Sequence, residues 1–568
     1  MKRVMRDAMM RQDHSYKAEI LSQAAKIVRE EALDAKYDKF SGSFEKDCQE
    51  AYVPPNLGIL VSMLLNGVNI SEEFDDSQCN LTIAQLLLFN MRKNRAKQGS
   101  RHHHKADQEP PLCTYLGLWI HSLTRSKKLI QKLHYYGICP AYDRIIAIQD
   151  DISYAVCEQY IRNGIVAPCW FEDMQEDDIL IFAADNVDHN PSSTTSNDSF
   201  HGTSLSMFKT GPLSGDNDEK TEKIKLPSSG SVKELPQSYS VVPCVEMQTT
   251  GLKAPLRLKS FDTNPAVTVE GVDAENEWLR HSASILEKEL VKDDRFGWYR
   301  FHASNMVMNV RSSFSQVLLP LFRDKAATVP MLKHTMDIVL STVNYLNPGQ
   351  IPVIVGDQPI YALLKKIQWK MPSAYGKDKI VVWPGGLHQE MALWTLLGDI
   401  LDGIGWDTLI SEADIATPGV AKSLLKVSHL MRTRNAHQVT LLSLFILKME
   451  AWNEYRDLPK STMSYHEWTT KMSSESPTFG YWQLVMDLEK KVLMFVRAQR
   501  SKDFFLYIQS LKDLVPYFFA LDHGNYARWT SVHIRDLCSL PESIHKAFCR
   551  GFWVLSKTKR RFSAIPVD

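Results

Sequence analysis

The sequence predicts a mixed α/β protein that is rich in helix. Two short runs of apolar and β-branched residues, at 351–356 and 379–383, are each followed by helical spacing, as in parallel strands that helices connect. A third run, at 179–188, precedes a polar loop and an alternating stretch at 199–208, which predicts a β-hairpin. Most of the remaining chain shows apolar residues at helical spacing, so long helical segments are expected before and after the strands.

Composition excludes several classes of protein. The chain has 568 residues, of which 44% are hydrophobic and 23% charged, so a folded protein of several domains is expected rather than a disordered one. Its 66 basic and 66 acidic residues cancel, so binding to nucleic acid would require a local basic patch. Nine scattered cysteines with no CxxC pair favour a reducing compartment over a disulfide framework or a zinc ribbon.

Two further features bear on location. The N-terminal residues are basic but no apolar segment follows them, so no signal peptide is expected. No uncharged apolar run reaches the roughly 18 residues that a membrane span requires. We therefore expect an intracellular protein with no membrane partner, and the nucleus is one candidate compartment.

Changes of pattern divide the chain into seven regions. Residues 1–110 are expected to be helical with a basic loop at 92–105, which is either a phosphate-contacting arm or a solvated loop. Adjacent histidines in this loop do not by themselves suit one metal ion. The other regions are a helical hairpin (111–175), the first β-hairpin of the core (176–208), a flexible insertion (209–272), a helical segment (273–347), the remainder of the α/β core (348–400) and a helical C-terminal region (401–568).

The helical hairpin has two interpretations. An amphipathic helix over 126–136 stops at Gly137, and a second helix begins after Pro140. This arrangement is compatible with a helix-turn-helix unit whose second helix enters a DNA groove. The alternative is an αα-hairpin that only packs, and the sequence leaves both open.

Acidic residues mark the ends of the expected strands. Asp185 and Asp188 lie at the end of the first strand of the hairpin, and Asp357 ends the strand that comes after the long insertion. Glu390 lies on the helix that follows the last strand. An RNase H-like core shows this order, with one acid on the first strand, one after the fourth strand and one on the helix after the fifth.

The chemistry of such a core explains the need for carboxylates. Cleavage or strand transfer at a phosphodiester by two metal ions requires carboxylates from separate elements to hold two hard cations about 4 Å apart. Asp185, Asp357 and Glu390 are the predicted catalytic set, with Mg²⁺ as the cofactor, and Asp188 is a further candidate ligand. Because a buried carboxylate is costly unless it is paired or binds a cation, a capping or loop role is the alternative for Asp188.

Four sequence motifs carry a resemblance to a known family. They are Asp-Asn-Val-Asp-His-Asn at 185–190, Gly-Asp-Gln-Pro at 356–359, Gly-Gly-Leu-His-Gln-Glu-Met at 385–391 and Asp-His-Gly-Asn-Tyr-Ala-Arg-Trp at 522–529. Together they resemble a family of uncharacterised, transposon-derived proteins of animal genomes, over about residues 110–568. The resemblance implies descent from an RNase H-like transposase, although the family has no established activity to carry over.

The chain differs in two respects from the proteins that it resembles. The first two motifs are also similar to a fungal-type domain of unknown function, which has an acid before a Phe-His pair where this chain has Gly386, Leu387 and His388. That difference implies that one acid of the set is missing. Members of the animal family continue beyond the block at 562–568, so a truncated copy is expected.

Asp522 is a second candidate for the third carboxylate. Some transposase folds insert helices before the last acid, and on that pattern Asp522 replaces Glu390. His388, His523 and Arg528 are additional candidates, because they lie in the same polar motifs. A basic helix start at 432–438 is either a phosphate contact or a solvated face.

Other chemistries lack their sequence signatures. There is no GxGxxG motif after a strand, no P-loop and no GxSxG motif, so no small-molecule cofactor is evident. The leading hypothesis is a transposase-derived nucleic-acid-processing protein with a metal-dependent site for phosphodiester cleavage or strand transfer and DNA as its partner. The alternative is a catalytically inactive domesticated or decaying copy that binds DNA or protein. The sequence specifies neither the nucleic-acid target nor the oligomeric state.

Overall fold

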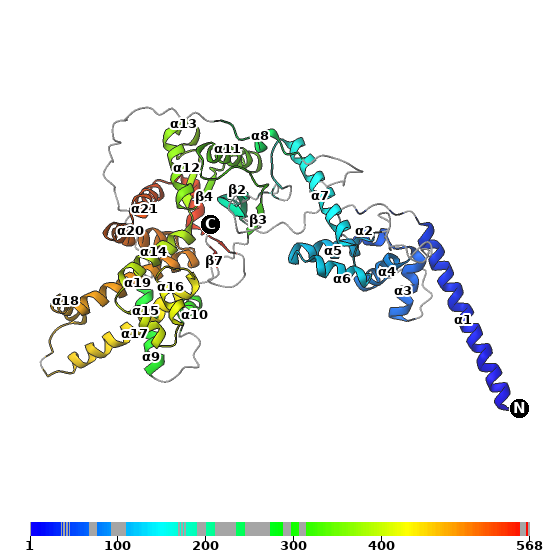
Figure 1. Ribbon diagram of the computed structural model, residues 1–568, viewed down its shortest axis with the longest axis horizontal. Coiled ribbons are helices and arrows are strands. Elements are labelled where there is room, and N and C mark those ends of the chain that lie inside the picture. Colours follow the sequence, from blue (N-terminus) through cyan, green and yellow to red (C-terminus); the bar gives the residue numbers. More distant parts are fainter. Residues whose placement is uncertain are drawn as a thin grey trace. The chain divides into compact units, whose positions relative to one another are not determined.

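The structure is a computed structural model of the chain that divides into two compact units (Figure 1). Unit 1 comprises Met1–Gly164 with Glu222–Pro236, and unit 2 comprises Ile165–Thr221 with Gln237–Asp568. The residues that the structure describes are 2–35, 37, 40, 44, 46–67, 76–91, 109–168, 171, 174, 178–189, 200–210, 234–244, 273–287, 297–305, 314–459, 461–556 and 564–565.

Unit 1 is helical, as the sequence predicts. Its helices are α1 (Lys2–Asp34), α2 (Lys46–Ala51), α3 (Pro55–Asn66), α4 (Gln78–Asn90), α5 (Pro111–Thr124), α6 (Lys127–Tyr135) and α7 (Tyr142–Asn163). The basic loop predicted at 92–105 lies outside the described residues.

The expected helical hairpin is part of a three-helix arrangement of α5, α6 and α7. Ile130, Cys139 and Ile145 are completely buried between these helices. α5 approaches α7 so closely that a Cβ atom on Gly117 would lie 2.5 Å from Cδ1 of Ile145. A larger side chain at this crossing would therefore force the side chain of Ile145 to shift.

A five-stranded mixed sheet lies in unit 2, with the strand order β3-β2-β1-β4-β5. The pairs β1–β2 and β2–β3 are antiparallel, whereas β1–β4 and β4–β5 are parallel. The hairpin and the two later strands are thus confirmed, and so is the mixed α/β class. The strands are β1 (Leu180–His189), β2 (Phe200–Thr210), β3 (Phe314–Leu318), β4 (Val353–Gly356) and β5 (Val381–Pro384).

One of these strands corrects a sequence prediction. The segment 273–347 was expected to be helical, and it does contain α9 (Ala274–Glu287), α10 (Trp298–Asn305) and α11 (Val329–Leu346). Phe314 and Leu318, which fit a helical stripe, belong instead to β3. Their spacing suits a helix, but the outer edge of β2 carries backbone groups that need partners, and β3 supplies them.

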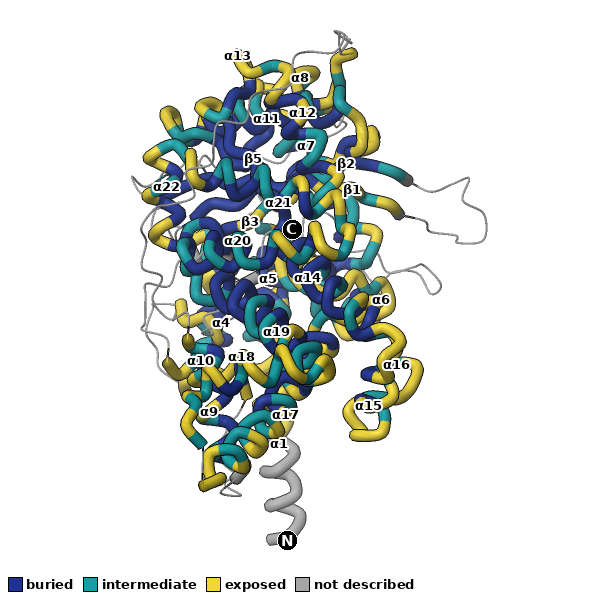
Figure 2. The backbone as a smooth tube through the Cα atoms, turned by 90° about the vertical axis from the view of Figure 1, so that its left-hand side faces the viewer, coloured by how far each residue is buried: buried dark blue, intermediate teal, exposed yellow. Residues whose placement is uncertain are grey.

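Different helices cover the two faces of the sheet. α11 and α12 (Gln358–Lys370) contact β1, β4 and β5, and they lie above the strands in Figure 1. α14 (Gly386–Leu401), α19 (Pro477–Ser501) and α20 (Phe504–Ala520) lie below the strands. Every second residue of β1, β4 and β5 packs against these three helices in one apolar core. The strand residues in this core are Ile181, Ala183, Val353, Val355, Val381 and Trp383. The strands are dark blue in Figure 2 where they cross this core, whereas β1 and β2 become teal and yellow toward their shared turn.

The insertion predicted at 209–272 is not wholly a linker. β2 continues to Thr210, and α8 (Gln237–Ser240) is packed on unit 2, because Tyr239 is buried and its hydroxyl donates to the backbone oxygen of Pro320 at 2.7 Å. Residues 211–233 and 245–272 lie outside the described residues.

The C-terminal region is helical, as expected. Its apolar stripes enter the core, except that Leu447 is 60% exposed. Besides α19 and α20, its elements are α15 (Trp406–Glu412), α16 (Pro418–Leu424), α17 (Leu430–Arg456), α18 (Tyr465–Glu475), α21 (Gly524–Leu537), α22 (Glu542–Cys549), β6 (Leu555–Ser556) and β7 (Ala564–Ile565). The remaining short helix, α13 (Pro372–Tyr375), precedes β5. Within the described part of the chain, no helix combines the length and apolar character needed to cross a membrane.

Candidate carboxylate site at the strand ends

Asp185 and Asp357 lie where the parallel pairing of β1 with β4 ends, although β1 itself continues beyond Asp185 to His189 in its pairing with β2. The register of β1 and β4 pairs Ala184 with Gly356, so the next residue on each chain segment is an aspartate. Paired strands are about 4.8 Å apart, which brings both positions within reach of one cation. Asp185 is exposed, and its Oδ1 accepts a hydrogen bond from the backbone N–H of Asn186 at 2.8 Å. The structure therefore brings two of the predicted acids to one edge.

Asp357 also begins a helix. Its Oδ1 accepts a hydrogen bond from the backbone N–H of Ile360 at 2.9 Å and thereby caps α12. The preceding Gly356 leaves no room for a side chain, because a Cβ atom there would lie 2.5 Å from Cγ2 of Ile360. The Gly-Asp pair thus forms a tight strand-to-helix turn, and the cap leaves Oδ2 of Asp357 for another partner.

Asp188 belongs to the other face of the hairpin. It lies three positions after Asp185, so the alternation of strand side chains turns it to the opposite side. There its carboxylate is 2.5 Å from Nδ1 of His201 across the hairpin and accepts a hydrogen bond from Nδ2 of Asn186 at 2.8 Å. The hairpin itself engages this carboxylate, which fits the loop role better than the metal-ligand role.

Glu390 is engaged in the core rather than presented at the edge. It lies on α14 and is only 2% exposed. Its carboxylate accepts hydrogen bonds from Nε and Nη2 of Arg434 at 2.8 and 2.7 Å, and from Nε1 of Trp394 at 2.9 Å. Because freeing Glu390 would leave a buried guanidinium unpaired, the structure does not present this residue as the expected third ligand.

Arg434 is not part of a solvated face at the basic helix start, because it is 6% exposed and paired with Glu390. Arg432 in the same segment is exposed, as the solvated-face interpretation expects. Arg500 lies close to Arg434, and burial together with the positive charge of Arg434 lowers the pKa of Arg500 to about 10. An additional positive charge is therefore costly here, which makes the negative charge of Glu390 necessary to this part of the core.

Asp522 and Arg528 lie together at the start of α21. Both line a surface pocket of about 430 Å³, and Asp522 adopts the left-handed region with φ at +57°. Neither Asp185 nor Asp357 is among the residues that line this pocket. The contacts of the structure thus do not assign Asp522 to the same edge.

The two candidate histidines connect α21 with α14. Nε2 of His523 is 2.7 Å from Oδ2 of Asp399, in the last turns of α14. His388 is exposed in the first turn of the same helix, and its backbone oxygen accepts a weak hydrogen bond from the hydroxyl of Tyr526 at 3.4 Å. These contacts position the two helices against each other.

The strand-end residues fit one cation and not two. Proteins commonly hold Mg²⁺ by one or two carboxylates and several waters, which Asp185 and Asp357 can match. A two-metal centre needs more carboxylates. Within the part of the chain that the structure describes, no group of three or more His, Cys, Asp or Glu side chains is arranged to hold a metal ion.

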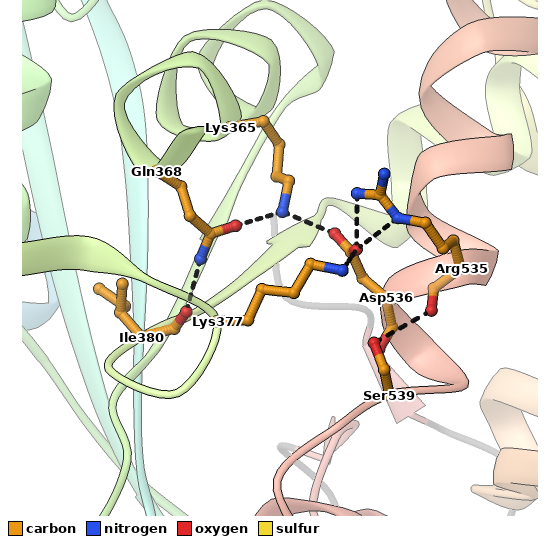
Figure 3. A network of polar contacts seen from close by, with 7 residues as sticks. All are labelled: Lys365, Gln368, Lys377, Ile380, Arg535, Asp536 and Ser539. Atoms are coloured by element: carbon orange, nitrogen blue, oxygen red, sulfur yellow. Dashed lines mark hydrogen bonds and ion pairs between the residues drawn. The ribbon is translucent and has the colours of Figure 1, made fainter. Parts of the chain in front are cut away.

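A buried charge network between α12 and α21 had no sequence prediction (Figure 3). Lys365 is 1% exposed, and its Nζ donates to Gln368 and lies 2.6 Å from Oδ2 of Asp536. Nζ of Lys377 lies 2.5 Å from Oδ1 of the same aspartate. Burial lowers the pKa of Lys365. Burial would by itself raise the pKa of Asp536, but the positive charges of Lys365 and Lys377 hold the pKa of this carboxyl below its usual range. The network therefore ties α21 to α12 through complementary charges.

Comparison with known proteins gives one partial match. The profile of a family described as a domain of unknown function (DUF8702) matches residues 447–568. No curated protein and no protein of solved structure matches the chain. The matched segment begins inside α17 and contains α18 to α22, so it supplies helices that cover the sheet but none of the five strands.

Proposed function

We propose that this chain is a transposase-derived, RNase H-like protein that binds one divalent cation at Asp185 and Asp357 and engages nucleic acid without cleaving it. The observation that carries the proposal is the sheet, in which the order is β3-β2-β1-β4-β5 and only β2 runs against the other strands. Asp185 on β1 and Asp357 directly after β4, the fourth strand, agree with the order of acids that the sequence predicts for an RNase H-like core.

The state of Glu390 supports binding without cleavage. Two-metal cleavage requires a third carboxylate at the strand ends, and Glu390 is instead held by Arg434 and Trp394. This favours the inactive-copy hypothesis over the nuclease hypothesis. Nucleic acid as the partner of this protein is consistent with an intracellular location such as the nucleus.

Cation binding is tested by titrating the purified protein with Mn²⁺, a paramagnetic stand-in for Mg²⁺, and following free Mn²⁺ by electron paramagnetic resonance. One site is expected in the wild type, and Asp185→Asn and Asp357→Asn should each weaken it at least about tenfold, since each variant removes one of two charged ligands. The matched control is Asp457→Asn, at the far end of α17, where the side chain is 72% exposed. Equal Mn²⁺ affinity in all four proteins would exclude the site.

The absence of cleavage is tested with labelled single-stranded and duplex DNA in Mg²⁺ and in Mn²⁺. No products are expected above the level of the Asp357→Asn variant. Products that form with the wild type and disappear in Asp357→Asn would overturn the inactive assignment and restore the nuclease hypothesis.

A further inference from the structure

We propose that α6 of unit 1 is a contact surface for double-stranded DNA. The proposal concerns unit 1 alone and does not rest on the carboxylate site of unit 2. α6 has one buried face, which Ile130 anchors, and one solvent-facing side. The exposed residues of α6 are Lys127, Lys128, Leu129, Gln131, Lys132 and Tyr135.

The charge of this surface is of one sign. No Asp or Glu occurs between Pro110 and Tyr142, whereas Arg125 and three lysines of α6 do. Within the described structure, neither Lys128 nor Lys132 forms an ion pair, and Lys127 lies over the ring of Tyr142 at 5.1 Å from its centroid. Because the whole chain has equal numbers of acidic and basic residues, this is the kind of local basic patch that a polyanion requires.

The surrounding structure holds α6 in a fixed orientation. A two-residue turn joins it to α5, in which Arg125 has φ at +50° and the hydroxyl oxygen of Ser126 accepts from the backbone N–H of Leu129 at 3.3 Å. At the other end, Nδ2 of Asn90 donates to the backbone oxygen of Gly137 at 2.8 Å. The lysines are thus presented from a packed scaffold rather than from a loop, which lowers the entropy cost of binding.

The dimensions and side chains favour duplex DNA. An α-helix with its side chains is about 10–12 Å in diameter, and the major groove of B-form DNA, about 12 Å wide, admits it. The major groove of A-form RNA is too narrow for such a helix. Tyr135 and Tyr136, 84% and 65% exposed, add aromatic and hydroxyl groups beside the lysines, which suit contacts to sugar and phosphate.

The structure assigns this role to α6 rather than to α7, which the sequence analysis considered as the groove-entering helix. α7 carries Asp143, Asp150 and Asp151, which would repel phosphates. Arg144, the basic residue in its first turn, is held by Glu109 through Nε and Nη2 at 2.8 and 2.9 Å. The helix-turn-helix pair is therefore α5 and α6.

The experiment measures binding of the full-length protein to a fluorescent 20-base-pair duplex by anisotropy over a range of salt concentrations. The test variant is Lys128→Gln/Lys132→Gln, and the matched control is Lys422→Gln/Lys426→Gln, which makes the same charge change on exposed positions of unit 2. Each lost phosphate contact should lower the slope of log K against log salt by about 0.9, so the test variant should lose about 1.8 of slope. At about 0.1 M salt its affinity should fall tenfold or more, while the control stays within about twofold of the wild type.

Three outcomes would overturn the proposal. They are a wild type that does not bind the duplex at low salt, a test variant that keeps both the affinity and the slope of the wild type, and tighter binding of single-stranded DNA or duplex RNA of equal length. Asp185→Asn/Asp357→Asn separates the two proposals, because it should leave duplex binding unchanged even where it abolishes Mn²⁺ binding. Loss of duplex binding in that variant would place the contact in unit 2 instead. Circular dichroism checks that every variant keeps the helical fold.

Discussion

Arg434→Met is expected to destabilise unit 2 strongly. In the wild type, the guanidinium of Arg434 makes two hydrogen bonds to the carboxylate of Glu390, and both side chains are buried. Methionine has a similar length but no charge, so the variant leaves Glu390 in the core with only the N–H of Trp394 as a partner.

The magnitude follows from the cost of an unpaired buried charge. Removing one partner of a buried ion pair costs about 3–5 kcal/mol, because the other charge keeps its desolvation penalty. An exposed pair would cost only about 0–1 kcal/mol. In the double variant Glu390→Met/Arg434→Met both charges are absent, so its free energy of unfolding should return to within about 1 kcal/mol of the wild type or exceed it.

The assay is urea denaturation followed by circular dichroism, with the wild type, both single variants and the double variant compared at one pH. A coupling energy above about 2 kcal/mol in this cycle would establish the pair as a buried structural contact. If Arg434→Met instead costs under about 1 kcal/mol, the pair is weak. Glu390 would then be available to a metal ion, and the reasoning behind the inactive assignment would fail.

Two further changes test the packing around the sheet. Gly398→Ala should lower the free energy of unfolding by at least about 1–3 kcal/mol, because its Cβ atom would lie 2.0 Å from the backbone oxygen of Leu425. The control is Gly419→Ala, whose Cβ atom would meet nothing within 4 Å and which should be neutral or slightly stabilising in the same denaturation assay. A small cost for Gly398→Ala would contradict the close approach of α14 to that segment. Asp536→Asn should cost about 3–5 kcal/mol at pH 7, because the buried ammonium of Lys365 loses its counter-charge and keeps only the neutral Gln368 as a partner. Burial lowers the folded-state pKa of Lys365 and Asp536 raises it, so the variant has the lower lysine pKa. The penalty is complete below the pKa of the variant and declines as the pH rises through it toward the pKa of the wild type. Urea midpoints at pH 7 to 10 should show the deficit shrinking, and a deficit that grows with pH would refute the account.

The local parts of the fold were predictable from sequence, because local patterns encode them. The hairpin and the strand before Asp357 follow from runs of apolar residues, and the position of Asp357 follows from the Gly-Asp-Gln-Pro turn. Asp357 comes beside Asp185 only because β1 pairs with β4, and this pairing joins residues that are 172 positions apart, such as Ala184 and Gly356. β3 was missed because its partner, the edge of β2, lies far away in sequence.

The state of the third acid could not be predicted in the same way. Glu390 has the residue type and the position of a ligand, and only its contact with Arg434, 44 positions later, shows that it is neutralised. Its helical neighbour Trp394, four positions away, was the one local signal of a structural role. Similarly, Lys365 looks like a surface lysine until Asp536 on α21 is placed beside it.

The helices that cover the lower face of the sheet have a consequence for how the protein is made. Trp383 in β5 packs in one core with Phe518 of α20, which lies 135 residues later in the chain. At about 5–20 residues per second, a ribosome needs roughly 7–27 s to synthesise that stretch. During this interval the apolar face of a newly made sheet has α14 but still lacks α19 and α20. The nascent chain is therefore a client for a holding chaperone, and synthesis that stops near residue 447, where the matched family segment begins, should yield an aggregating fragment.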